Sequence, residues 1–114
     1  MANYCFCTPI LPGGLEQMKK WNGEMIVNNK EHDEAFRSAG ISREQVWVQH
    51  TPQGDFAVVS FEVKDPTKTF QALATSQKPW AVKFREFLNK AHGIDFTHPV
   101  PPNQLLVDWH DKGR

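Results

Sequence analysis

The sequence predicts one compact α+β domain with the element order βαββαβ, in which a four-stranded antiparallel sheet carries its helices on one face. A chain of 114 residues is long enough for one core and too short for two. Two alternating runs joined by a short turn indicate a β-hairpin, and amphipathic helical stretches precede and follow it. We therefore treat residues 1–114 as a single domain.

The first strand and the first helix come before the hairpin. Aromatic and small side chains alternate over residues 4–8, which predicts the strand, and a Pro-Gly-Gly turn follows at residues 12–14. From residue 15 onward apolar positions recur at helical spacing, and the helix should end near Gly40. The Asn-Gly pair at residues 22–23 costs about 1 kcal/mol relative to better helix formers, so the helix can break there.

The hairpin is expected from residues 44–51 and 56–63, with Thr51 paired to Phe56. That pairing places one set of mainly apolar residues on the side that helices should cover: Val46, Val48, His50, Ala57, Val59, Phe61 and Val63. The opposite side carries Gln45, Trp47, Gln49, Phe56, Val58, Ser60 and Glu62. This second side is too apolar, at its tryptophan, phenylalanine and valine, to be left in water.

The second helix and the last strand complete the pattern. Asp65 followed by Pro66 is typical of a helix start, an N-cap before a proline at the first helical position. Pro79 should break or kink this helix, and its apolar stripe then runs to Gly93. The proline-rich residues 98–102 are expected to form an extended connection to a last strand at residues 105–109, followed by a frayed tail.

This order of elements resembles the dimeric α+β barrel superfamily of ferredoxin-like proteins over nearly the whole chain. Within it, the chain is similar to small members of unknown function. The similar residues are Glu-Gln-Val-Trp-Val-Gln at 44–49, Thr-Pro-Gln-Gly-Asp at 51–55, Glu62 and Asp65-Pro66. The resemblance implies two sheets meeting face to face across a homodimer, with helices outside and ligand pockets between each sheet and its own helices. In such a dimer, the sheet of the second copy would cover the face that carries Trp47, Phe56 and Val58.

Some members of that superfamily are cofactor-free or haem-degrading monooxygenases. They rely on combinations of Asn, Trp, His or Tyr near the pocket. Here the second helix offers Trp80 and His92, but the first strand offers only Asn3 at its start. The set cannot be assembled residue by residue, so the activity is not carried over.

The charge balance and the positions of the cysteines limit which partners and cofactors we expect. The 13 Lys and Arg residues balance 13 Asp and Glu, and no basic RNA-binding strand signature is present, so neither nucleic acid nor a membrane is expected as a partner. The N-terminal residues show no leader pattern, which predicts a cytoplasmic protein. Cys5 and Cys7, two apart on one strand, are expected to be buried, reduced thiols. They could supply only half of a thiolate metal site, so neither a metal nor another cofactor is expected.

Three residues are the candidates for ligand binding. His50 ends a strand on the otherwise aliphatic helix-facing side, where an imidazole could act as a base or bind a ligand. His32 and Trp80 lie on the apolar stripes of the two helices that should cover this side, so the three side chains should converge. The alternatives are a hydrogen-bonded edge histidine, a core histidine and a packing tryptophan. His92, next to Gly93, fits a cation at a helix C-terminus.

Two functions of different classes follow, with a third by analogy. The first is a small-molecule-binding protein with its pocket between sheet and helices. The second is a structural or regulatory dimer without chemistry, in which Trp21, Trp47, Trp80 and Trp109 serve packing. The third, a cofactor-free oxygenase, rests on the superfamily alone. An apolar cavity with convergent polar groups would separate the first from the second.

Overall fold

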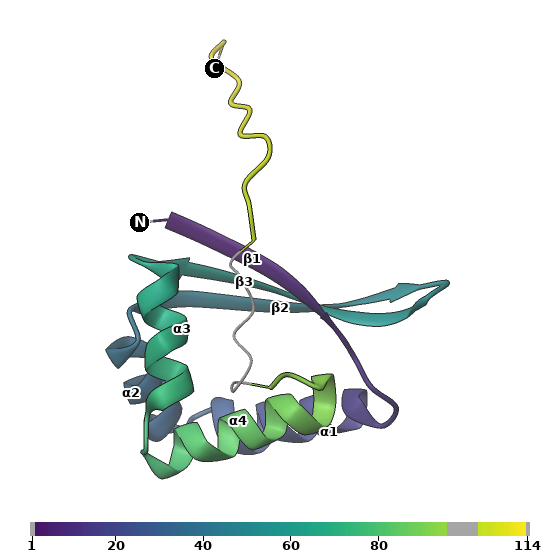
Figure 1. The fold of residues 1–114 in the computed structure, drawn as a ribbon, viewed down its shortest axis with the longest axis vertical. Coiled ribbons are helices and arrows are strands. Elements are labelled where there is room, and N and C mark those ends of the chain that lie inside the picture. The colour runs from purple at the N-terminus through teal and green to yellow at the C-terminus, as the bar shows by residue number, and fades with distance from the viewer. Residues whose placement is uncertain (1, 96–102, 114) are drawn as a thin grey trace.

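The computed structural model describes residues 2–95 and 103–113 of an α+β chain (Figure 1). The elements are β1 (Ala2–Pro9), α1 (Gly14–Trp21), the π-helical segment η1 (Asn22–Ile26), α2 (Lys30–Ser38), β2 (Ile41–Thr51), β3 (Gly54–Val63), α3 (Pro66–Thr75) and α4 (Pro79–His92). The strands form an antiparallel sheet in the order β1-β3-β2, and the helices lie on one side of it. The α+β class and the one-sided helices agree with the sequence analysis.

The sheet has three strands among the described residues, where the sequence predicted four. Residues 105–109, the expected last strand, pair with no strand in the described part of the chain and run away from the body beyond β1. A lone strand is not stable without a neighbour, and apolar alternation does not reveal where that neighbour is. The expected connection at residues 98–102 lies outside the described residues.

The hairpin is confirmed, but its predicted register is wrong by two residues. Thr51 pairs with Gly54, and Phe56 pairs with Gln49, because the turn is shorter than expected. Thr51 closes this turn: its hydroxyl donates to the Gly54 carbonyl over 2.6 Å and accepts from the Gln53 amide over 3.2 Å. Since side chains alternate with a period of two, an error of two residues leaves every face assignment unchanged.

A β-bulge interrupts the start of β2. Ile41 pairs with Val63, whereas Arg43 pairs with the adjacent Glu62, so Ser42 is an extra residue in its strand. The Ser42 hydroxyl donates to the Glu62 carbonyl over 3.3 Å. The bulge brings both Ile41 and Glu44 to the helix-facing side, although three positions separate them.

The single helix predicted for residues 15–40 is wrong, because the chain forms two helices joined by η1 and a turn. The expected weak point at residues 22–23 opens η1, where the Val27 amide reaches back to the Asn22 carbonyl over 3.0 Å. The chain then leaves the helix, with Val27 extended and Asn28 at a φ of 53°. Asn29 caps α2, its side-chain oxygen accepting from the His32 amide over 2.9 Å.

The signals around the second helix are confirmed. The Asp65 carboxylate accepts from the first free amides of α3, and Gly93 ends α4 in the left-handed region at a φ of 73°. The helix is interrupted between α3 and α4, immediately before Pro79. Arg85 ties the two helices together, since its guanidinium donates to the Leu73 and Ser76 carbonyls over 2.7 and 2.8 Å.

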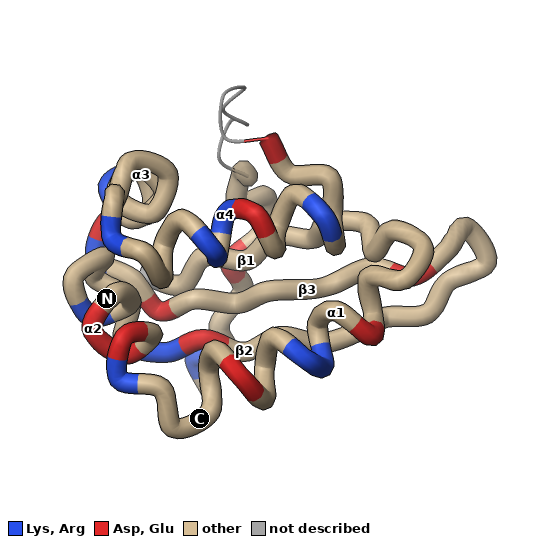
Figure 2. The backbone as a smooth tube through the Cα atoms, turned by 90° about the horizontal axis from the view of Figure 1, so that it is seen from below, with Lys and Arg blue, Asp and Glu red and all other residues tan. Residues whose placement is uncertain are grey.

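The core fills the space between the sheet and the helices. Its buried residues come from both layers: Phe36, Ala39, Ile41, Val59, Phe61, Val63, Leu73, Trp80, Ala81 and Phe84. Charges of both signs are interspersed over the helices, without a patch of one sign (Figure 2). Within the described residues, none of the helices has the length and apolarity required to cross a bilayer.

Candidate functional site

An aromatic cluster occupies the layer between the sheet and the helices. Trp80 of α4 stacks on Phe84 at 5.0 Å between ring centroids and meets Phe36 of α2 edge-on at 5.9 Å. Phe36 in turn meets Phe61 of β3 at 6.2 Å. These four rings are all buried. They form an apolar wall that spans from the helices to the sheet.

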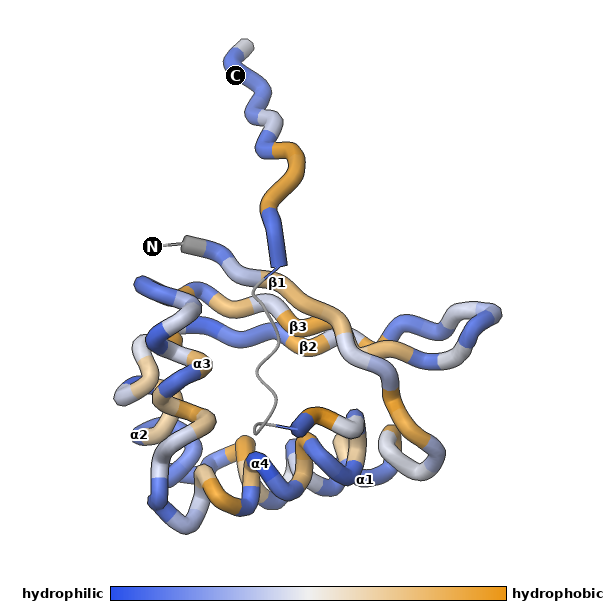
Figure 3. The backbone as a smooth tube through the Cα atoms, in the orientation of Figure 1, coloured by the Kyte–Doolittle hydropathy of each residue, from blue (hydrophilic) through white to orange (hydrophobic). Residues whose placement is uncertain are grey.

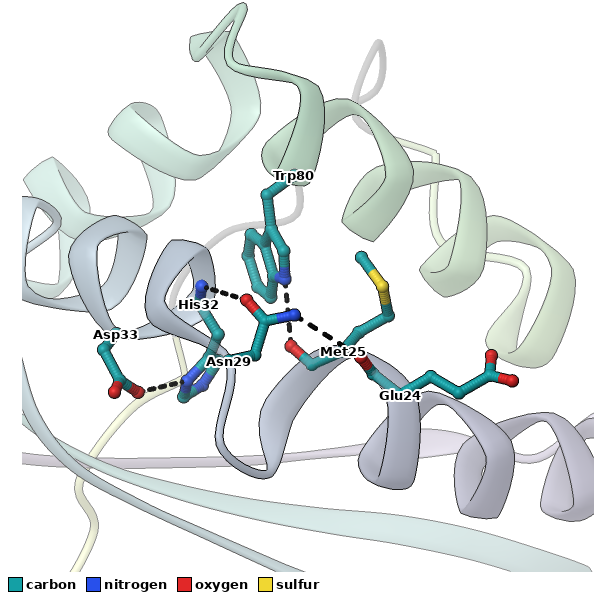
Figure 4. Close-up of polar contacts among 6 residues, drawn as sticks. All are labelled: Glu24, Met25, Asn29, His32, Asp33 and Trp80. Carbon is teal, nitrogen blue, oxygen red and sulfur yellow. Dashed lines mark hydrogen bonds and ion pairs between the residues drawn. The ribbon is translucent and has the colours of Figure 1, made fainter.

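His32 and Trp80 are brought together, as the sequence predicted. Figure 4 shows the two rings near each other, and their centroids lie 5.5 Å apart at an interplanar angle of 66°. The His32 ring also lies 4.3 Å from that of Phe36. The cap formed by Asn29 fixes the first turn of α2 and with it the starting position of His32. Only 13% of the His32 side chain is exposed.

The two ring nitrogens of His32 have different surroundings. Nδ1 lies 2.9 Å from the Asp33 carboxylate, which accepts a hydrogen bond and therefore holds the ring proton on Nδ1. Nε2 is buried and has no hydrogen-bond partner. In the neutral ring, Nε2 is then an unused acceptor at the edge of the aromatic cluster. Buried polar atoms are nearly always satisfied, so this atom calls for an explanation.

The two interior tryptophans also differ in whether their indole N–H has a hydrogen-bond partner. Trp80 is anchored, because its indole N–H donates to the Met25 carbonyl of η1 over 3.0 Å (Figure 4). Trp21 stacks on Phe87 with ring centroids 4.8 Å apart and planes almost parallel, yet its buried indole N–H has no partner. The interior thus contains an unused donor on Trp21 as well as the unused acceptor on His32.

Glu44 adds an acidic group on the sheet side of the same cluster. It lies on the helix-facing side of β2, directly opposite Phe61. Burial raises the pKa of Glu44 from its ordinary value of 4.5 to about 7. Glu44 and His32 therefore border the cluster from its two layers, connected through the contacts of Phe61 with Phe36 and of Phe36 with His32. A carboxyl group that keeps its proton near neutral pH can donate a hydrogen bond or a proton.

Sequence reasoning did not select Glu44. The signal was available, since alternation gives position 44 the same face as Val46, Val48 and His50. A carboxylate on an otherwise aliphatic side of a strand is unusual and often functional. Trp21 was considered only for packing, and nothing in the sequence indicates that its N–H is unpaired.

His50 does not join His32 and Trp80. It lies on the helix-facing side, as expected, but at the end of the hairpin, where 70% of its side chain is exposed and Nδ1 lies 2.7 Å from the Asp55 carboxylate. It lies six positions along the strand from Glu44, a distance of about 20 Å. This side of β2 is incompletely covered well before the hairpin end, since Val46 is already 47% exposed.

His92 also differs from its expected role. It is buried rather than solvated, and Nδ1 donates to the Pro9 carbonyl over 2.9 Å. Burial lowers the pKa of His92, an effect that this hydrogen bond only partly offsets. The residue is thus a neutral link between the end of β1 and the end of α4, and the predicted cation at the helix terminus is wrong.

The outer face of the sheet is graded from polar to apolar. One row across the strands contains Asn3, Glu62 and Arg43, and the last two form an ion pair at 4.0 Å. A hollow of about 160 Å³ lies over this polar end. Two rows further along, Cys7, Val58 and Trp47 lie side by side, and Trp47 is 49% exposed.

The expectation that Cys5 and Cys7 are buried is wrong. Both thiols are free and exposed, because they lie on the outer face of β1, which no described element covers. Within residues 2–95 and 103–113, no three His, Cys, Asp or Glu side chains come close enough to hold a metal ion. A second hollow, of about 330 Å³ and open to solvent, is lined by Glu34, Arg37, Ser38 and Lys78, away from the aromatic cluster.

Comparisons of the chain with protein-family models, with curated proteins and with solved structures gave no significant match. The geometry of Glu44, His32 and the aromatic wall is therefore the basis for assigning a function.

Proposed function

We propose that this protein binds a small, flat molecule between its sheet and its helices, at Glu44, His32 and Trp80. The observation that carries the proposal is the buried, unpartnered Nε2 of His32 at the edge of an aromatic cluster. A ligand hydroxyl would satisfy that atom. The proposal replaces His50 with Glu44, because His50 is exposed at the hairpin end and already paired with Asp55.

The chemistry of the side chains defines the ligand class. The rings of Phe36, Phe61 and Trp80 favour a flat apolar body, since aromatic faces contribute through stacking and burial. The Glu44 carboxyl, protonated below about pH 7, would donate to a carbonyl oxygen. A molecule with a carbonyl and a hydroxyl group on an aromatic body matches both groups.

Access would be from the edge of the sheet formed by β2. Val46 and Val48 follow Glu44 on the helix-facing side and are both exposed, so the covering layer is open next to Glu44. A ligand entering there would meet the Glu44 carboxyl first and the aromatic wall behind it.

The test is a titration with a hydroxynaphthoquinone probe, followed by quenching of tryptophan fluorescence and by calorimetry. His32→Ala and Glu44→Leu should each weaken binding about tenfold, the effect of losing one buried hydrogen bond. His50→Ala is the matched control and should leave the affinity unchanged. Binding should also weaken as the pH rises through about 7, and Glu44→Gln should remove this dependence.

Two results would contradict the proposal. One is an equal loss of affinity in His50→Ala, which would move the site to the hairpin end. The other is unchanged binding in both His32→Ala and Glu44→Leu. If no member of a panel of hydroxy-carbonyl aromatics binds, the structural dimer without a ligand becomes the better interpretation.

The protein is proposed to work as a homodimer joined through the outer face at Trp47, Phe56 and Val58. Support comes from the exposure of Trp47 and from the apolar row that it forms with Val58 and Cys7. Two such sheets face to face would make the dimeric α+β barrel that the resemblance implies. Trp47→Lys should raise the dimer dissociation constant at least about tenfold in sedimentation experiments, whereas Val48→Lys, on the opposite face, should not.

A further inference from the structure

The C-terminal arm, residues 103–111, has a composition that does not fit its surroundings. It leaves the body of the molecule beyond β1 and carries an apolar segment followed by a polar end (Figure 3). Leu105, Leu106, Val107 and Trp109 are between 72% and 87% exposed. Four large apolar side chains within five residues are rarely left in water.

The edge of β1 that pairs with no described residue is a place where such a segment fits. Within the described residues, β1 pairs with β3 on one side only, so half of its backbone amides and carbonyls point outward from the sheet. An open edge of this kind is a template for a further strand. The eight residues of β1 extend over about 26 Å and residues 103–109 over about 23 Å, so the lengths match.

The arm begins at the far end of the β1 edge of its own chain. The chain leaves α4 beside Pro9, where His92 donates to the Pro9 carbonyl, and it reaches Tyr4 at Asn103, whose amide donates to the Tyr4 hydroxyl over 3.1 Å. An antiparallel strand continuing from there would have only the first residues of β1 left to pair. The apolar run starts later, at Leu105, and by then its own β1 has ended.

We infer that residues 103–109 of one copy add as a fourth strand to the edge of β1 opposite β3 in a second copy, and that the two copies exchange these arms. The exchange is reciprocal, as a twofold axis requires. In the extended arm, Leu105, Val107 and Trp109 share one side, and they continue the outer face beside Cys5 and Cys7 of the other copy. Asp108 and His110 point to the opposite side. The inference rests on the proposed homodimer and specifies how its fourth strand is completed.

The first test is the oligomeric state of a chain that ends at Asn103. Sedimentation velocity should give a dimer for the full chain and a dissociation constant at least about tenfold higher for the shortened chain. Removal of residues 111–114 alone is the control and should have no effect. Circular dichroism should show that the shortened chain keeps its fold, because the exposed apolar side chains of the arm stabilise little of the isolated body.

The second test asks whether the arm reaches another molecule. A chain with its native Cys5 and Cys7 is mixed with a heavier, tagged chain carrying Cys5→Ser, Cys7→Ser and Val107→Cys, and the mixture is oxidised. A covalent heterodimer of the two masses is expected. Asp108→Cys in place of Val107→Cys is the matched control and should give little product, because its side chain lies on the other side of the strand.

The outcomes separate this inference from the dimer proposal. If the shortened chain dimerises as well as the full chain while Trp47→Lys does not, the arm exchange is wrong and the sheet-face dimer stands. If Trp47→Lys dimerises normally and the shortened chain does not, the arm exchange stands alone. A monomeric full chain overturns both proposals. A disulfide within one chain, when Val107→Cys is combined with the native cysteines, overturns the arm exchange alone.

Discussion

Glu44 and His50 lie on the same face of the same strand and have opposite environments. Glu44 is opposite the buried Phe61 and keeps its proton to about pH 7, whereas His50 lies at the exposed hairpin end with Asp55. Strand alternation determines which face a residue occupies. It does not determine whether anything covers that face, because coverage depends on how the helices pack against the sheet. The site therefore lies at the covered end of the strand.

The largest effect should come from the residue opposite Glu44. Phe61→Ala removes a buried ring that contacts the rings of Phe6, Phe36 and Phe70, and should cost about 3–5 kcal/mol of unfolding free energy. Asp55→Ala, opposite His50, removes only an exposed pair and should change stability by less than about 1 kcal/mol. Urea denaturation of both variants measures the contrast, and similar losses would show that the hairpin end is covered after all.

The next effect concerns the titration of Glu44. Its pKa in the folded protein is above its ordinary value, so between about pH 4.5 and 7 the folded state holds a proton that the unfolded state releases. The free energy of unfolding should therefore fall as the pH rises through this window and stay low above it. Glu44→Gln should remove this fall and make the protein more stable by about 2–3 kcal/mol at about pH 8. An unchanged pH profile in Glu44→Gln would show that the carboxyl is solvated.

His92 should contribute to the pH dependence of the stability. The pKa of His92 is lowered below its ordinary 6.5, so the unfolded state binds a proton that the folded state excludes. Stability should fall as the pH drops below about 6.5, and His92→Gln should lessen that fall while keeping a donor for the Pro9 carbonyl. Chemical denaturation of the native protein and of His92→Gln over a range of pH measures this contribution, and an equal fall in both would contradict it.

The smallest effect is on the reactivity of the outer-face thiols. Cys5 and Cys7 are exposed in the single chain, so both should react with a disulfide reagent at low protein concentration. In the proposed dimer this face is covered, and the reaction should slow as concentration rises. A rate independent of concentration, with the dimer established by sedimentation, would place the interface elsewhere.

The parts of the fold that could be predicted depend on neighbouring residues in the sequence. The faces of the hairpin, the Asp65 cap and the Gly93 helix end follow from local periodicity and capping chemistry, and the faces were correct even with the register displaced by two residues. The turn at Val27 and Asn28 was not predicted, because tertiary packing decides where the helix stops. Of the candidate site, His32 and Trp80 were found through their helical stripes. Glu44 was missed, because alternation gives the face of a residue but not how deeply that face is covered.

The bulge at Ser42 sets the phase of the whole strand. Because the bulge adds one residue, both Ile41 before it and Glu44 after it face the core, although one is an odd and the other an even position of the strand. Deleting Ser42 would force a choice between burying the isoleucine and placing the carboxyl against the aromatic wall. A substitution of Ser42 changes the hydroxyl contact with the Glu62 carbonyl, whereas a deletion changes which side of the sheet Glu44 occupies. In a lineage of such proteins, loss or gain of a single residue at this point would be enough to switch the acidic group into or out of the interior.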